Sequence, residues 1–238
     1  MIIRIGIEKG YENKVVAYAL DYPGCFAYGM DEAEALLKLP QVLLKYEVWI
    51  KDHTEGRWVN FTEMDLRVTD VIDSFVINEE SHPELAGVEV NAFFKDDLRP
   101  VTEIEVERAL LVFTWQREEL YGGISTLSEE ELEMQYPDQR WNILGILKHI
   151  ANAENWYLSR LGFSSLPKDK LPEQPLTRLE MMQEAVSTEF RQFPLDTRVL
   201  NIDGETWSCR KILRRTLWHQ RDHIEHIKQL VFRISTRV

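Results

Sequence analysis

The sequence predicts an α+β protein with a small N-terminal α/β domain over residues 1–97 and an all-α four-helix bundle over residues 101–238. Three observations lead to this expectation. Residues with high β propensity dominate the first segment, up to Tyr28. Charged residues and a proline interrupt this pattern between Lys95 and Pro100. Beyond that point the apolar residues recur with the period of a helix, so we place the domain boundary there.

The N-terminal segment has the pattern of three strands followed by a helix. We expect strands over residues 2–7, 15–20 and 25–28, separated by turn-forming residues. A helix then begins near Asp31, just after Gly29. These elements make up the predicted α/β domain.

Four amphipathic helices are expected beyond residue 100. Thr102 and Glu105 form a capping box that opens the first helix, and Gly122-Gly123 is expected to stop it. The second helix follows Trp141-Asn142 and ends at Gly162.

The third and fourth helices complete the bundle. Thr177 and Glu180 form a second capping box, for a helix that extends to about Phe193. Ser208 caps a long last helix that extends to about Ile234. Four helices of this kind favour an α-helical bundle, in which sites are built from inward side chains of facing helices.

Composition and charge argue against several classes of protein. Of the 238 residues, 44% are hydrophobic and 29% are charged, which is typical of a folded globular chain. The net charge of −12 argues against binding of nucleic acid. No apolar run is long enough to span a membrane and the start lacks a signal-peptide pattern, so we expect a cytoplasmic protein without membrane contact. The two cysteines, Cys25 and Cys209, lie in different halves of the chain, which argues against a disulfide framework.

Three of the six histidines occupy positions typical of metal ligands. His219 and His223 lie four residues apart and therefore share one face of the last helix. His149, on the second helix, would complete a set of three imidazoles with an open position for water or substrate. Such a set suits several divalent metals, of which Zn and Ni are our first expectations. A metal-free core of hydrogen-bonded histidines would leave the same sequence pattern.

Two further residues are candidates for roles beside this set. Glu154 lies five residues after His149, off its face of the helix, and is a candidate catalytic group that orients a ligand or acts as a base. His226 lies three residues after His223 and is a candidate for supporting a metal ligand through a hydrogen bond. A position on the helix surface is the alternative for His226.

The first fifty residues carry a pattern of their own. It consists of the strand end Ala19-Leu20-Asp21-Tyr22-Pro23-Gly24, the following Cys25-Phe26-Ala27-Tyr28-Gly29, and the acidic helix start Asp31-Glu32-Ala33-Glu34-Ala35. This segment resembles the HicB-like antitoxin domain, a small module with a truncated RNase-H-like fold. The resemblance implies binding of a protein partner, and a purely structural scaffold is the alternative.

The helical part carries a second resemblance. The matching segments are 141–154, 207–213 and 218–227, in which tryptophans flank the histidines. They resemble the DinB/YfiT-like superfamily of metal-binding four-helix bundles. The resemblance implies that the three histidines are the metal ligands and that the protein pairs as a homodimer.

Two hypotheses about function follow. The first is a metal-dependent enzyme in which the metal activates water for hydrolysis, or a low-molecular-weight thiol for transfer to a small-molecule substrate. The basic start of the last helix, with Arg210, Lys211, Arg214 and Arg215, would guide an anionic substrate. The second is a non-catalytic regulatory or stress-linked protein, which captures a protein partner through its HicB-like domain while the bundle dimerises.

Overall fold

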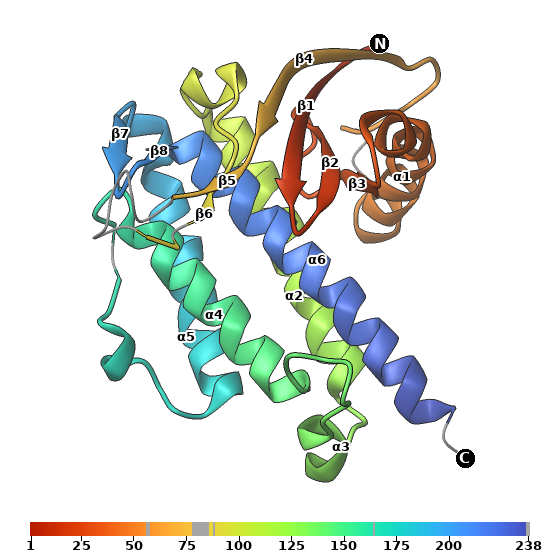
Figure 1. The fold of residues 1–238 in the computed structure, drawn as a ribbon, viewed down its shortest axis with the longest axis vertical. Coiled ribbons are helices and arrows are strands. Elements are labelled where there is room, and N and C mark those ends of the chain that lie inside the picture. Colours follow the sequence, from red (N-terminus) through yellow and green to blue (C-terminus); the bar gives the residue numbers. More distant parts are fainter. Residues whose placement is uncertain (56–57, 78–85, 88, 164, 237–238) are drawn as a thin grey trace. The chain divides into compact units, whose positions relative to one another are not determined.

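The chain forms two units in its computed structural model (Figure 1). The structure describes residues 1–55, 58–77, 86–87, 89–163 and 165–236. Unit 1 consists of Met1–Pro100 and Thr197–Arg214, and unit 2 of Val101–Asp196 and Arg215–Val238. The α+β class is confirmed, because the described residues contain a sheet near the N terminus and six helices. Among these helices, none combines the length and apolar character needed to cross a bilayer.

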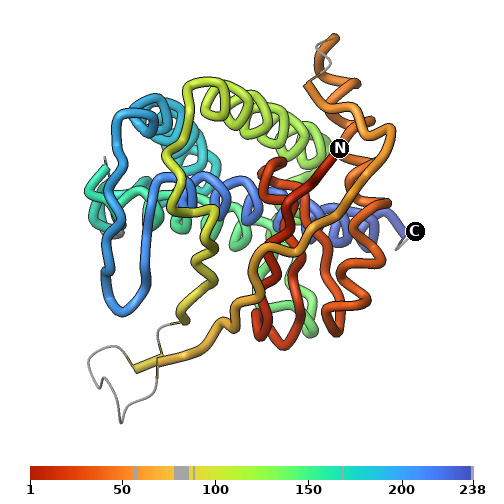
Figure 2. Tube along the Cα trace, turned by 90° about the horizontal axis from the view of Figure 1, so that it is seen from above, coloured from red at the N-terminus to blue at the C-terminus, as the bar shows by residue number. Residues whose placement is uncertain are grey.

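A four-stranded sheet forms the core of unit 1. Its strand order is β3-β2-β1-β4, with β1 at Ile2–Tyr11, β2 at Lys14–Ala19, β3 at Phe26–Gly29 and β4 at Asp65–Asp73. Strand β2 is antiparallel to β1 and β3, whereas β4 runs parallel to β1 and lies beside it in Figure 2. Between β3 and β4 the chain forms helix α1 (Glu32–His53), which packs against β2 and β3 (Figure 1).

Apolar side chains and a tight turn explain the first two strands. Ile3, Ile5 and Ile7 alternate along β1 and are completely buried. Glu12 and Asn13 make the turn into β2, and their positive φ angles of 48° and 60° suit a two-residue hairpin loop. The turn and the buried alternation together fix the register of the sheet.

One short strand pair and one short hairpin complete the described strands of unit 1. Strand β5 (Phe75–Val76) pairs with β6 (Glu89–Val90), and β7 (Val199–Ile202) pairs with β8 (Glu205–Ser208). The turn of the β7–β8 hairpin is Asp203-Gly204, with φ angles of 54° and 79°. This hairpin was not among the elements expected from the sequence.

Basic side chains at the start of helix α6 (Cys209–Ser235) are buried in unit 1. Lys211 is completely buried, and its Nζ lies 2.6 Å from Glu205 Oε1. Arg214 Nη2 lies 2.7 Å from the Oδ2 atom of Asp97. Each cation has a carboxylate within hydrogen-bond distance, as a buried charge requires.

Unit 2 is helical. Its helices are α2 (Glu103–Ile124), α3 (Glu129–Glu133), α4 (Ile143–Ser159), α5 (Pro175–Glu189) and the part of α6 beyond Arg214. Helices α4 and α5 pack against each other along their lengths (Figure 1). A 3₁₀ turn follows α5 at Phe190–Leu195. The sequence missed the short helix α3, whose start is capped by Ser128.

The ends of α2 agree only in part with the sequence signals. The capping box is confirmed: Thr102 Oγ1 accepts from Glu105 N at 3.3 Å, and Glu105 Oε2 accepts from Thr102 N at 2.8 Å. The predicted stop at Gly122-Gly123 is wrong, because α2 continues through both glycines to Ile124. Ile124 is buried, so the apolar contact of its side chain favours one more turn despite the low helix propensity of glycine.

Of the predicted starts of α5 and α6, one is wrong and one is confirmed. Helix α5 begins at Pro175 rather than after Thr177, because Gln174 Oε1 accepts the Thr177 N–H at 2.6 Å and acts as the cap. Ser208 caps α6 as expected, since its Oγ accepts from Lys211 N at 3.2 Å.

We expect Gly29→Ala to destabilise unit 1. A Cβ atom at this position would lie 2.3 Å from the backbone nitrogen of Ala35 and 2.6 Å from the Asp31 carbonyl oxygen. The free energy of unfolding should fall by about 1–3 kcal/mol in urea titrations followed by circular dichroism. Gly122→Ala is the matched control, because apart from the adjoining helix backbone no described atom lies within 4 Å of its Cβ position, and the better helix propensity of alanine should add up to about 1 kcal/mol. An unchanged free energy for Gly29→Ala would contradict the close approach.

Candidate metal centre

Helix α4 presents His149 from the edge of its buried face. Asn142 fixes the helix start, because its Oδ1 accepts from Gly145 N at 2.8 Å. Ile146 and Ile150 are completely buried and set the rotation of the helix. His149 lies one turn after Ile146 and directly before Ile150, at the edge of this face, and is partly exposed. Its imidazole is therefore held in place but remains accessible.

Helix α6 presents His219 and His223 from successive turns. Gln220 is completely buried, and its Nε2 donates to Phe113 O at 3.1 Å and to Gln116 Oε1 at 3.0 Å on helix α2. These bonds fix the rotation of this part of α6. His219 is 6% exposed, whereas His223 is partly exposed.

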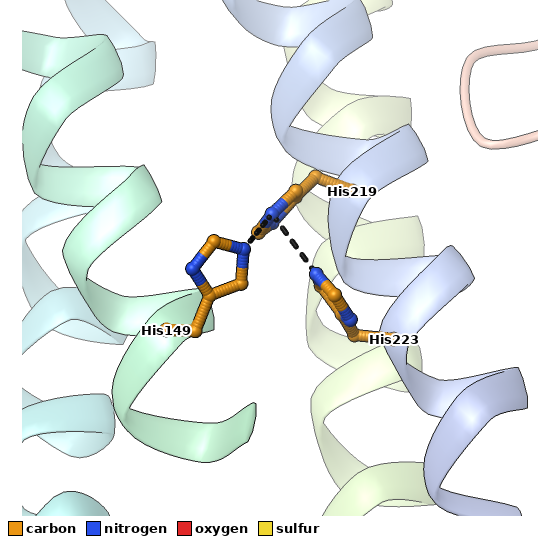
Figure 3. Close-up of side chains that lie close together, drawn as sticks. All are labelled: His149, His219 and His223. Atoms are coloured by element: carbon orange, nitrogen blue, oxygen red, sulfur yellow. Dashed lines mark hydrogen bonds between the residues drawn. The ribbon is translucent and has the colours of Figure 1, made fainter. Parts of the chain in front are cut away.

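The three imidazoles converge through their Nε2 atoms (Figure 3). His219 Nε2 lies 3.0 Å from His149 Nε2 and 3.1 Å from His223 Nε2. One ring nitrogen of each histidine lies within 4.8 Å of those of the other two. Metal–nitrogen bonds of about 2.0–2.1 Å would separate neighbouring ligand nitrogens by about 2.9–3.4 Å at angles between octahedral and tetrahedral. Both of the shorter separations fall in this range.

Burial keeps these imidazoles neutral. Burial is the main cause that lowers the pKa of His219 well below its usual value, and a proton on His223 or His149 would act in the same direction. Burial and the neighbouring His149 lower the pKa of His223 to about 3. The pKa of His149 is also lowered, first by burial and then by the positive charge of Arg140. Neutral imidazoles keep the lone pairs that a metal ion needs.

Aromatic rings enclose the cluster on two sides. The Trp141 indole stacks on His149, with ring centroids 4.5 Å apart and an interplanar angle of 25°. Tyr157 meets His219 edge-on, with centroids 6.0 Å apart. The absence of a side chain at Gly145 makes room for Trp141, because a Cβ there would lie 3.0 Å from the Trp141 Cβ.

His226 lies beside the cluster and has its own partner. Its ring centroid is 6.3 Å from that of His223, and its Nε2 lies 2.7 Å from Gln139 Oε1. The three clustered histidines do not include it. His226 therefore ties the segment before α4 to helix α6.

Glu154 is not brought together with the histidines. Its carboxylate is 1% exposed, and Oε1 lies 2.7 Å from Nη2 of Arg117, which is completely buried. Burial raises the pKa of Glu154, and the charge of Arg117 opposes that shift. This arrangement supports a structural ion pair between α2 and α4 rather than a base at the cluster.

The basic start of α6 does not form an exposed rim. Arg210, Lys211 and Arg214 are all buried within unit 1. Arg215 belongs to unit 2 and is also buried, with its guanidinium 4.1 Å from the Trp218 ring centroid. Burial at these four positions argues against the substrate-guiding role expected from the sequence.

Sequence reasoning missed the role of residues 139–141, which contact the histidines through the Trp141–His149 stack and the Gln139–His226 bond. Gln139 and Arg140 gave no recognisable motif, and Trp141 was noted only as one of the tryptophans that flank the histidines. The available signal was their position directly before the Asn142 cap of the helix that carries His149. Residues directly before a capped helix start are held close to the side chains of the first helical turns, which here include His149.

Comparison with known proteins supports part of this interpretation. Residues 112–227 match the family model of the DinB superfamily, so this segment is similar to that superfamily, as the resemblance implied. The matched segment contains all three clustered histidines. It does not reach residues 1–100, so the HicB-like resemblance stays a prediction. Curated proteins and solved structures gave no match.

We expect the metal-free protein to lose stability as the pH falls from 6.5. Unfolded histidines bind protons near this pH, whereas folded His223 stays neutral down to about 3 and the pKa of His219 is also well below 6.5. Acid therefore favours the unfolded chain, by about 1.4 kcal/mol per pH unit for each histidine that stays neutral. Urea titrations between pH 6.5 and about pH 5 measure this slope. This pH window lies above the range where most carboxylates titrate. His223→Gln should reduce the slope by the share of one histidine, and an identical slope would contradict the assignment.

We expect Glu154→Ala to destabilise the protein by about 3–5 kcal/mol, because it leaves the Arg117 guanidinium buried without its carboxylate. The double variant Arg117→Met/Glu154→Leu should recover much of this loss, since it removes both charges. Glu173→Ala is the control: its exposed pair with Lys148, at 3.2 Å, should contribute less than about 1 kcal/mol. Equal effects of Glu154→Ala and Glu173→Ala in urea titrations would refute the buried pair.

Proposed function

We propose that unit 2 is a DinB-type four-helix bundle in which His149, His219 and His223 hold one divalent metal ion, with Zn and Ni as the first candidates. The observation that carries this proposal is the convergence of three imidazole nitrogens from α4 and α6. The similarity of residues 112–227 to the DinB superfamily supports it.

The cluster fits a metal ion better than a network of hydrogen bonds. An imidazole nitrogen has one bonding position in the ring plane, either an N–H or a lone pair. His219 Nε2 nevertheless has two nitrogen neighbours, at 3.0 Å and 3.1 Å. A hydrogen bond can satisfy only one of these contacts, whereas a shared metal ion would account for both. The lowered pKa values of His219 and His223 also mean that these rings stay neutral near pH 7, so their nitrogens do not repel a metal cation.

The chemistry follows from the donor set. A divalent ion held by three neutral imidazoles would act as a Lewis acid that activates water for hydrolysis or a low-molecular-weight thiol for transfer. His149 and His223 are the partly exposed members, so a small-molecule substrate would approach from their side. Trp141 and Tyr157 would limit the orientation of that substrate and exclude part of the solvent.

His226 has a supporting role in this proposal. Its bond to Gln139 holds the segment that positions Trp141 against His149. We assign no proton transfer to Glu154, because its carboxylate is bound to Arg117.

A second candidate function, capture of a protein partner by unit 1, has an observation of its own. Leu37, Leu44 and Val48 on helix α1 are 81%, 46% and 58% exposed and lie at helical spacing along one face. Exposed apolar side chains at such spacing are typical of surfaces that bind other proteins. Under this proposal the four-strand and one-helix arrangement is HicB-like, and unit 2 forms a homodimer. Partner capture would survive His219→Ala, whereas catalysis would not.

Elemental analysis of the untagged protein is the experiment that tests the metal site. We expect about one Zn or Ni per chain in the parent and little in His149→Ala or His219→Ala, because two ligands hold such ions weakly. His53→Ala is the control, since this exposed histidine lies on α1 in unit 1. Circular dichroism must show that the variants are folded. A parent that stays metal-free after incubation with either ion would refute the proposal.

A further inference from the structure

Arg140 lies beside the histidine cluster on an aromatic platform. Its guanidinium carbon is 4.4 Å from the ring centroid of Trp141. The Trp141 indole in turn stacks on His149, with centroids 4.5 Å apart. The Trp141 indole therefore contacts both a cation and a candidate metal ligand, and the charge of Arg140 acts on the His149 imidazole.

The segment that carries this platform is fixed at both ends. Before Arg140, Gln139 bonds to His226 on α6 at 2.7 Å, and its carbonyl oxygen accepts from Gln135 Nε2 at 2.6 Å. After Trp141, the Asn142 side chain donates to Glu133 O at 3.0 Å and caps α4. Fixing the backbone on both sides lowers the entropy that a binding group loses when a ligand arrives.

No carboxylate neutralises Arg140 within the described part of the chain. The nearest acidic residue in sequence, Asp138, is bound to Arg233, with distances of 2.9 Å and 3.0 Å to its two guanidinium nitrogens. Arg140 itself is exposed, and neither a hydrogen bond nor an ion pair engages it among the residues that the structure describes. Its stacking on Trp141 is thus the contact that the described residues provide, and none of them accepts a hydrogen bond from its N–H groups.

A stacked arginine is well suited to hold an anion. Stacking occupies the face of the guanidinium but leaves the N–H groups in its plane, which match the two oxygens of a carboxylate or phosphate. The chain as a whole carries a net charge of −12, which repels anions from most of its surface. Arg140 would therefore favour binding of anionic small molecules over neutral ones at the cluster, without making the rest of the surface attractive to anions.

We propose that Arg140 is a specificity-determining residue that binds a carboxylate or phosphate group of a small molecule whose other end reaches the histidine cluster. The proposal rests on the metal site proposed above and names the substrate class for it: small anionic molecules with a group that can coordinate a metal.

The test uses Co²⁺ as a spectroscopic metal and matched thiols as probes. The Co²⁺-loaded protein is titrated with 3-mercaptopropionate, with 2-mercaptoethylphosphonate and with the uncharged 3-mercapto-1-propanol, and thiolate binding is followed by ultraviolet charge-transfer absorption. The two anionic probes distinguish a carboxylate site from a phosphate site. The readout is the ratio of dissociation constants between an anionic probe and the uncharged one, so it does not depend on any catalytic activity.

The variants isolate the guanidinium. Arg140→Gln removes the charge at an exposed position, and Arg140→Lys keeps the charge but not the planar fork. Arg160→Gln is the matched control, because Arg160 also stacks on a tryptophan of unit 2, at 4.8 Å from the ring centroid of Trp156. It lies beyond the other end of α4, far along the helix from His149.

We expect the parent to favour at least one anionic probe, by about five- to tenfold more than Arg140→Gln does, as for a charge-assisted bond at a partly solvated position. Arg140→Lys should keep part of this preference and Arg160→Gln all of it. The same ratio in the parent and in Arg140→Gln, with Co²⁺ bound to both, would overturn this inference and leave the metal site intact. A parent that fails to bind Co²⁺ would overturn the metal site and the inference together.

Discussion

The candidate site depends on one constraint, which is the free-energy cost of placing a protonated imidazole in a buried position. His219 is nearly removed from solvent and faces two other histidines, so a proton on any of the three would be opposed by burial and by its neighbours. The surrounding contacts keep the rings in this unfavourable arrangement. Gln220 fixes the rotation of α6, and the Trp141 indole stacks on the His149 ring.

The histidine cluster differs from three buried cations of the chain in that it has no carboxylate partner among the described residues. Arg117, Lys211 and Arg214 are buried as well, and each has a carboxylate within 2.7 Å. Within the described ranges, no carboxylate bonds to any of the three clustered histidines. These three buried cations are paired with anions, whereas the clustered imidazoles are neutral, so their lone pairs remain available to a cation.

Local patterns predicted what depends on local interactions. The first three strands and the long helices followed from sequence patterns, whereas the short helix α3 did not, and the spacing of His219 and His223 showed that they share a helix face. Pairing between distant segments was not predictable in this way. Glu154 was assigned to chemistry because its partner Arg117 lies on another helix. The basic start of α6 was expected to be exposed although Asp97, the partner of Arg214, lies 117 positions earlier in the sequence. The β7–β8 hairpin was predictable, since Asp203-Gly204 is a strong turn signal.

Unit 1 is discontinuous in sequence, and this affects how the protein can be made. A ribosome releases the sheet and Asp97 first, followed by all of residues 101–196, and only then Lys211 and Arg214. Until those cations emerge, Asp97 has no guanidinium to replace its hydration and stays in water. The nascent chain therefore carries an unfinished first unit through most of its synthesis, and both units are completed only as translation ends.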